Sequence, residues 1–354
     1  MFGNYFIFNT GFVIMFTGFR TENHFLKEFT RMKKILSVIL AIALMICCAS
    51  VMAEQSPIKV AVVYSDTVDD KGWCQAMHEG ILKVQAAGAN IEYTPVESVA
   101  VPNASATLDQ LAGEYDIIII HGAQFTTATT EIAEEYPEQV FVLGTSDKIL
   151  GDNIFTYMPQ SEETGYVNGV IAAMLTKVGK VGVVGSQDNG DSARFVRGFY
   201  MGVKSVNADT ECMVSWTGSF SDTIGAGDIT KTFIESGCDI LTGSSQQAVG
   251  GIRAAEAAGN VTWIGQTLSQ LNDFPAVVIA AGDYDYAAVL VSVINEMANG
   301  VTGGKCIPMN FNNNGFVYEF SENVPAEVKT AAEEALAKLT AEADTLASYI
   351  DVQF

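Results

Sequence analysis

The loop DTVDDKGWC, residues 66–74, combines three carboxylates with a tryptophan near the start of the globular part of the chain. It follows the apolar run IKVAVVYS and precedes a segment with apolar residues at helical spacing. Loops that follow the strands of an open α/β sheet face the crevice in which such sheets bind ligands. The sequence therefore predicts that this loop is one wall of a small-molecule site, and that Trp73 lies against a flat ring.

The two adjacent aspartates of this loop have two possible uses. A carboxylate can accept hydrogen bonds from ring N–H or amino groups of a ligand, and it can also cap the helix that follows. We assign one aspartate to each use and expect Asp70 to be the ligand residue and Asp69 the cap. Trp73 also has a structural alternative, as a hydrophobic staple at the start of the helix.

Further candidates lie in the loops that follow other predicted strands. Phe220, in GSFSD, offers a second aromatic face, and the amides of Gln124 and Gln246 suit the edge of a heterocycle. Arg194 opens a helix that we expect to face the site, although an ordinary surface role is equally open. The predicted ligand-binding set is Asp69, Asp70, Trp73, Gln124, Phe125, Arg194, Phe220, Ser244, Gln246, Thr267, Ser269 and Asp283.

Signatures of catalysis are scarce in the sequence. After residue 53 the chain has two histidines, His78 and His121, and we expect the second to be a core residue. The segment GTSDK lacks the second glycine of a nucleophile elbow, and there is no P-loop or strand-linked GxGxxG. The aspartates of the first loop are not at the alternate positions of a calcium loop. We expect no enzyme activity, cofactor or metal; a secreted α/β hydrolase is the remaining catalytic alternative.

Ten apolar runs, beginning near residues 59, 90, 116, 140, 154, 180, 212, 240, 262 and 276, alternate with segments of helical periodicity. This order predicts an α/β fold with parallel sheets covered by helices on both faces. The run KVAVVYS at 59–65 is echoed by KVGVVGS at 180–186. We therefore expect two similar lobes, each with its own sheet, and a ligand site between them.

Charge and the N-terminal segment bear on compartment and partners. The 354 residues carry 19 Lys and Arg against 41 Asp and Glu, a net charge of -22, which argues against nucleic acid or an anionic membrane as a partner. Residues 32–53 have the basic start, apolar core and small-residue end of a signal peptide cleaved after Ala53. We expect residues 1–31 to precede the true start of translation, at Met32. A lipid anchor on Cys47 or Cys48 is the alternative, and we expect no required disulfide among Cys74, Cys212, Cys238 and Cys306.

Together with the signal peptide, the ordered set DDKGW, GYVNGVIAAM, GKVGVVGS and WTGSFSD resembles the basic membrane protein (BMP) family of ABC-importer solute-binding proteins. The resemblance covers residues 58 to about 318. It implies a type I periplasmic-binding-protein fold, with two Rossmann-like lobes, three crossovers and a hinge that closes on ligand. It assigns ring stacking to Trp73 and Phe220, and places residues 57–158 with 281–305 in the N-terminal lobe and residues 159–280 with 306–354 in the C-terminal lobe.

The resemblance also implies a function and partners. The chain would be a monomer in the periplasm or at the cell surface, delivering a purine-like ligand to a permease and its ATPase subunits. Nucleoside-binding members resemble one another in an IGxDxDQ loop, where this chain has Thr267 and Ser269 in place of the acids, and a lysine expected after the next strand is absent. These departures favour a free purine base. A nucleoside, riboflavin or a sugar in the same fold remain alternatives.

Overall fold

The computed structural model describes residues 56–70, 72–342 and 346–354. The expected translation start, signal peptide and cleavage site lie outside the described residues. In the part described, no helix is both long enough and apolar enough to cross a membrane.

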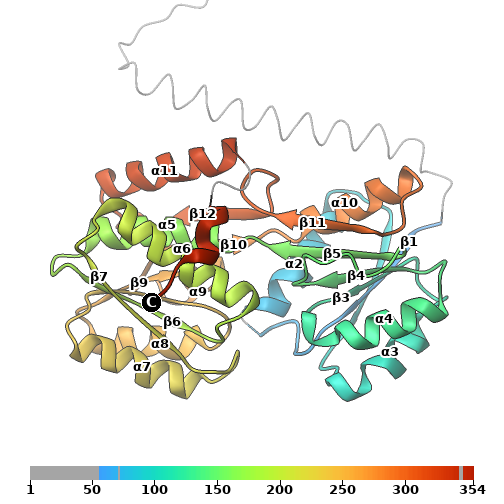
Figure 1. Ribbon diagram of the computed structural model, residues 1–354, viewed down its shortest axis with the longest axis horizontal. Helices are drawn as coiled ribbons and strands as arrows, with labels where there is room; N and C mark the ends of the chain where they lie inside the picture. Colours follow the sequence, from blue (N-terminus) through green and yellow to red (C-terminus); the bar gives the residue numbers. More distant parts are fainter. Residues whose placement is uncertain (1–55, 71, 343–345) are drawn as a thin grey trace, which may run out of the picture. The chain divides into compact units, whose positions relative to one another are not determined.

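Two six-stranded sheets organise the described residues, one in each lobe (Figure 1). The strands of the first sheet, in chain order, are β1 (Ile58–Val63), β2 (Ile91–Val96), β3 (Ile117–Ile120), β4 (Val140–Gly144), β5 (Ile154–Pro159) and β11 (Lys305–Met309). Those of the second are β6 (Lys180–Gly185), β7 (Glu211–Trp216), β8 (Ile240–Gly243), β9 (Thr262–Gly265), β10 (Val278–Tyr284) and β12 (Phe316–Phe320).

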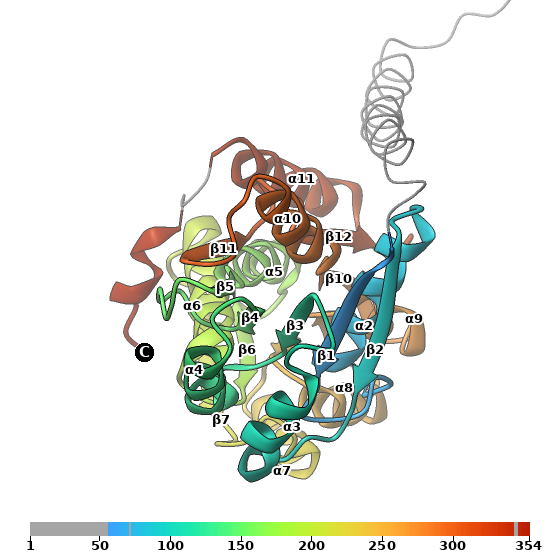
Figure 2. The same cartoon turned by 90° about the vertical axis from the view of Figure 1, so that its right-hand side faces the viewer.

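Helices cover both sheets (Figures 1 and 2). The first lobe contains α2 (Trp73–Ala86), η1 (Val101–Asn103), α3 (Ala104–Leu111), η2 (Ala123–Phe125), α4 (Thr126–Glu135) and α10 (Ala287–Ala298). The second contains α5 (Glu162–Leu175), α6 (Gly190–Val206), α7 (Thr223–Glu235), α8 (Ala248–Ala258), α9 (Leu268–Asp273), α11 (Ala326–Ala341) and η3 (Ala347–Asp351). The α/β fold class predicted from the alternating runs is confirmed.

The two sheets repeat one topology. The first has the order β11-β5-β4-β3-β1-β2 and the second β12-β10-β9-β8-β6-β7, so β1 and β6 occupy equivalent places next to the edge strand. These are the strands that carry the repeated KVxVV pattern. In β6, Val183 packs into the core on the α6 side, whereas Val184 packs into the cluster beneath α7 and α8. Because successive side chains of a strand point to opposite faces, a continuous apolar run supplies both cores.

The structure departs from the expected parallel sheets and lobe boundaries near the C-terminal end. Strand β12 pairs antiparallel to β10, because the chain returns from β11 through a short connection. Strand β10 runs to Tyr284 in the second sheet, past the expected boundary at residue 280, and β11 pairs with β5 in the first sheet to Met309, past residue 305.

Helices α5 and α6 approach each other through glycines, and this contact positions the start of α6. A Cβ atom on Gly198 would lie 2.1 Å from the Glu162 carbonyl oxygen, and one on Gly202 would lie 2.1 Å from that of Tyr166. Gly165 and Gly169 of α5 meet the backbone of α6 in the same way. Only residues without a Cβ allow backbones so close, so this pair of helices is fixed in register.

Candidate functional site

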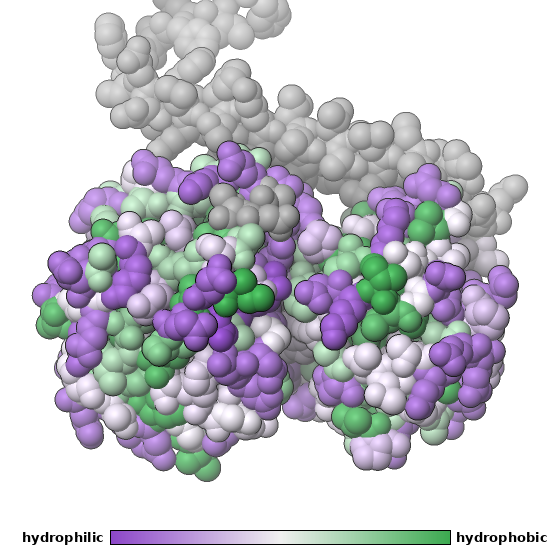
Figure 3. All heavy atoms as spheres, in the orientation of Figure 1, coloured by the Kyte–Doolittle hydropathy of each residue, from purple (hydrophilic) through white to green (hydrophobic). Residues whose placement is uncertain are grey.

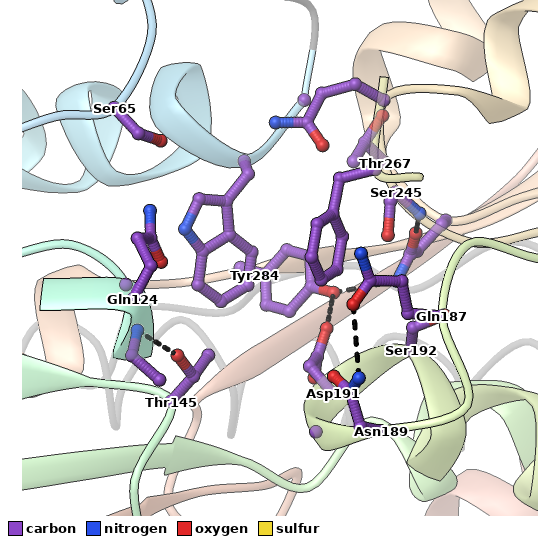
Figure 4. Close-up of a pocket in the computed structure, with 18 of the residues that line it drawn as sticks. Ser65, Gln124, Thr145, Gln187, Asn189, Asp191, Ser192, Ser245, Thr267 and Tyr284 are labelled. Atoms are coloured by element: carbon purple, nitrogen blue, oxygen red, sulfur yellow. Dashed lines mark hydrogen bonds between the residues drawn. The ribbon is translucent and has the colours of Figure 1, made fainter. Parts of the chain in front are cut away.

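A cavity of about 560 Å³ lies between the loops of the two lobes. Its lining comes from the carboxyl ends of strands in both sheets, the position at which open α/β folds bind ligands. Figure 4 shows Ser65, Gln124 and Thr145 of the first lobe across the cavity from Gln187, Asn189 and Asp191 of the second. The space-filling view shows a furrow between the two lobes on the face drawn (Figure 3).

Trp73 lines the cavity, and its indole ring packs against three other aromatic rings. Its indole is stacked on His121, with ring centroids 4.6 Å apart and planes at 15°. Tyr284 and Tyr286 meet it edge-on, with centroids 5.3 and 5.5 Å away. These contacts fix the plane of the indole before any ligand arrives, so it is preorganised for stacking.

His121 belongs to the core beneath Trp73, as the sequence led us to expect. Its Nε2 lies 2.9 Å from the Trp73 carbonyl oxygen and its Nδ1 lies 2.6 Å from the Tyr157 hydroxyl. Burial lowers the pKa of His121 to about 4. The ring is therefore neutral near pH 7, donating from Nε2 and accepting from Tyr157 at Nδ1.

Five of the predicted site residues line the cavity: Trp73, Gln124, Phe220, Gln246 and Thr267. Trp73 and Gln124 come from the first lobe and the other three from the second, so the structure brings them together from four strand-to-helix connections and the β9–α9 turn. Phe220 is 46% exposed, and its ring has free surface to offer a ligand.

The cap of α2 is not the aspartate that we expected. Asp70 caps α2: its carboxylate accepts from the backbone N–H of Gly72, Cys74 and Gln75 at 2.9–3.1 Å. Asp69, expected to be the cap, is exposed and does not line the cavity. The assignment of the cap to Asp69 is therefore wrong, because the backbone of the loop presents its N–H groups to the second carboxylate.

Three other predicted residues are occupied within the protein. Arg194 forms a two-pronged ion pair with Glu162, at 2.7 and 2.8 Å, and donates to the Tyr349 hydroxyl. Phe125 is fully buried in the core of the first lobe. Ser244 is fully buried and lies 2.7 Å from the Ser192 hydroxyl.

The last two predicted residues, Ser269 and Asp283, support the turn beside α9 rather than the cavity lining. Ser269 lies 2.9 Å from the Thr267 hydroxyl. Asp283 accepts from the N–H groups of Leu268 and Tyr284, each at 2.8 Å, and burial raises its pKa to about 7.

Several lining residues were missed by the sequence analysis, Asp191 and Tyr284 among them. Both lie in segments that the alternation of strands and helices marks as site walls. Asp191 is in the first turn of α6, three residues before the Arg194 that was chosen instead. Tyr284 was missed because β10 continues four residues beyond residue 280, where we expected this segment of the second lobe to end. Alternation along this extension points Asp283 toward α9 and Tyr284 toward the cavity.

The lining is rich in amides and poor in charge. The glutamines are Gln124, Gln187, Gln246, Gln266 and Gln270, joined by Asn189. Amide groups both donate and accept, which suits the mixed edge of a heterocycle. Thr145 and Ser245, at opposite walls, have φ values of 58° and 65°, a left-handed backbone that is uncommon outside glycine and is enriched at binding sites.

A sequence model of the Bmp family, described as ABC transporter substrate-binding protein PnrA-like, matches residues 58–343. This chain belongs to the Bmp family. Bmp proteins are substrate-binding components of ABC transporters, exported to the periplasm or cell surface, where they act with permease and ATPase subunits and without catalysis. The resemblance noted in the sequence is therefore confirmed.

Two Bmp relatives and one solved structure are informative. A purine-binding protein of Brucella abortus is 27% identical, covering 80% of this chain and 81% of that protein. The nucleoside-binding protein BmpA of Lactococcus lactis is 25% identical, covering 79% and 86%. A solute-binding protein from Conexibacter woesei superposes with a TM-score of 0.68 at 21% identity, over 84% of this chain and 98% of that one, which supports the type I fold.

Proposed function

We propose that this Bmp protein binds a free purine base, or a closely related flat heterocycle, in the cavity between its lobes and delivers it to a membrane permease. The observation that carries the proposal is Trp73, whose ring is preorganised by His121, Tyr284 and Tyr286 and lines a cavity rich in amides. A planar ligand stacked on such a ring gains about 0.5–1.5 kcal/mol beyond its apolar burial.

The surroundings of the ring support a heterocycle over a sugar. Phe220 offers a second apolar face, and the amide side chains can pair with ring nitrogens and exocyclic groups. A volume of about 560 Å³ is in the range of cavities that hold small organic ligands. The names of the purine-binding and nucleoside-binding relatives indicate ligands that contain the same kind of heterocycle.

The hydrogen bonds of the turn that precedes α9 favour a free base over a nucleoside. Thr267 and Ser269, which stand where the resemblance to nucleoside-binding family members implies acids, lie within hydrogen-bond distance of each other. Asp283, the nearest acid on the following strand, accepts from backbone N–H groups. Thr267 and Ser269 carry no carboxylate, and the carboxylate of Asp283 is already bonded to the backbone of the turn. The turn is therefore poorly suited to accept hydrogen bonds from the two hydroxyls of a ribose.

The remaining parts of the proposal concern the exported form. We propose that the signal peptide is cleaved after Ala53, that the mature chain acts as a monomer, and that it captures its ligand without altering it. Ligand contacts with both lobes stabilise the closed form, which is presented to the permease.

Thermal-shift and calorimetric titrations of the mature chain, from Glu54 onward, test the proposal. The panel is adenine, guanine and hypoxanthine, their nucleosides, riboflavin and glucose. A ligand that binds only the folded state raises the melting temperature with its concentration. We expect a larger shift with a base than with its nucleoside, and recovery of the ligand unchanged. A larger nucleoside shift contradicts the preference for a base, and a response to riboflavin or glucose alone contradicts the purine.

A further inference from the structure

Asp191 is the one charged side chain among the described residues that line the cavity. It lies in the first turn of α6, partly buried, where the glycine-mediated packing of α5 against α6 brings Ser161 beside it. Figure 4 shows its carboxylate next to the hydroxyl of Tyr284. The lining otherwise consists of amides, hydroxyls, aromatic rings and small residues.

The hydrogen bonds around Asp191 run in one direction. The hydroxyls of Ser161 and Tyr284 donate to its two carboxylate oxygens, the latter at 2.7 Å. The Tyr284 hydroxyl in turn accepts a hydrogen bond of 2.7 Å from Nε2 of Gln266. The other end of this amide, Oε1 of Gln266, accepts from the backbone N–H of Ser245. Since the Tyr284 hydroxyl has one proton and accepts from Gln266, that proton is committed to Asp191.

A carboxylate at the end of such a chain can only accept further hydrogen bonds. Each oxygen has a second lone pair after accepting from one hydroxyl. We propose that Asp191 is a specificity-determining residue, which accepts a hydrogen bond from a ring N–H or amino group of the bound heterocycle. This inference rests on the proposed function, and it places a donor edge of the ligand at the start of α6.

The charged groups around Asp191 are paired with other partners, which leaves its carboxylate able to accept a hydrogen bond from a ligand. Burial raises its pKa to about 6, against the lowering effect of its two hydroxyl partners and of Arg194. Arg194 is paired with Glu162, Glu163 accepts from the Phe311 N–H, and Asp283 is bonded to backbone. Among the described residues no cation pairs directly with Asp191, and an N–H donor from a ligand would add a third hydrogen bond to its ionised form.

Calorimetric titration of D191N against wild type at pH 7.5 tests the inference. The probes are adenine, 6-methylpurine, in which the amino group is replaced, and 9-methyladenine, in which the ring N–H is replaced. Loss of a charge-assisted bond should weaken adenine binding about tenfold or more in D191N. The analogue that lacks the donor in contact with Asp191 should bind wild type more weakly than adenine does, with no further loss in D191N.

The matched control is D188N, in the loop just before α6, whose carboxylate pairs with Arg197 and does not line the cavity. We expect its adenine affinity to be unchanged. Should D191N not fold, the wild-type pH profile and the Y284F variant remain. Wild-type affinity should fall as the pH drops below about 6, because protonation removes the acceptor, and Y284F should weaken adenine binding without abolishing that pH dependence.

The outcomes separate this inference from the proposed function. If wild type binds adenine and D191N binds it within twofold, the role of Asp191 is overturned while the function stands. If D191N loses affinity for adenosine only, Asp191 holds the sugar and the inference fails. If wild type binds no purine, both are overturned together.

Discussion

Gln246 of the second lobe donates a hydrogen bond of 3.1 Å to the carboxylate of Asp70 in the first lobe. The same carboxylate caps α2, the helix that begins with Trp73. Gly72 lies against the Gln246 side chain, where an added Cβ would be 3.0 Å from its Cγ. The cap, the stacking residue and the contact between lobes are therefore one structural unit.

We predict that Q246A loosens the contact between the lobes while leaving the fold intact. The substitution removes the bond to Asp70 but keeps the three backbone bonds of the cap. Ligand affinity should fall about tenfold or more, since a hydrogen bond to a charged group contributes about 1.5–3 kcal/mol net. Small-angle scattering of the ligand-free protein should show a larger radius of gyration. D70A, by contrast, should also lower unfolding stability, by about 1–2 kcal/mol, through loss of the cap.

W73A should weaken binding of the ligand by about tenfold or more, through loss of both stacking and apolar burial. W73F should retain most of the affinity, because a smaller ring still presents a face. Trp216 is the matched control: it packs near Phe354, outside the cavity. Equal losses in W73A and W216A, measured by calorimetry, would show that stacking at Trp73 is not the source of affinity.

R194A should destabilise the protein without changing its ligand affinity. Arg194 and Glu162 are 12% and 4% exposed, and the substitution removes the cation that balances the charge of this buried carboxylate. Such a loss costs about 3 kcal/mol. Urea unfolding gives the stability and calorimetry the affinity. A large affinity loss at unchanged stability would restore the ligand role that the sequence suggested for this arginine.

Asp283 should impose a pH dependence on unfolding. Burial raises its pKa to about 7 in the folded protein, so the folded state holds a proton that the unfolded state releases from about pH 4 upward. Its contribution to stability is therefore largest at low pH and is lost as the pH rises to about 7. Relative to D283N, wild type should lose up to about 4 kcal/mol between pH 4 and pH 8. A constant difference between the two unfolding curves would contradict the shifted pKa.

G202A should lower stability by about 3 kcal/mol or more, because its Cβ would lie 2.1 Å from the Tyr166 carbonyl oxygen. Separating α5 from α6 should also move Ser161 away from Asp191 and weaken ligand binding. G151A is the control, since its Cβ would meet the movable Ile154 side chain at 3.3 Å. Thermal unfolding of both variants, with and without ligand, measures the two effects.

The sequence by itself determined the fold class and the place between the lobes at which the cavity lies. Apolar runs in alternation with helical patterns specify parallel strands joined by helices, and all ten predicted strands are present. The echo between 59–65 and 180–186 marked equivalent strands of two sheets. The loops that wall the cavity could be named because every parallel strand delivers its following loop to the same edge of the sheet.

Only the tertiary structure decided which side chains within those loops face the cavity. Asp69 and Asp70 are indistinguishable by type, and the direction of the loop N–H groups selected Asp70 as the cap. Arg194 was a candidate ligand residue by type and position, but in the folded protein it pairs with Glu162 at the start of α5. Asp191 became the charged residue of the lining through the close packing of α5 on α6 and the four-residue extension of β10 to Tyr284. For Arg194 and Asp191, partners that are distant in sequence set these choices, and local patterns carry no information about them. For Asp70, the path of the loop backbone set the choice, and residue types alone do not specify that path.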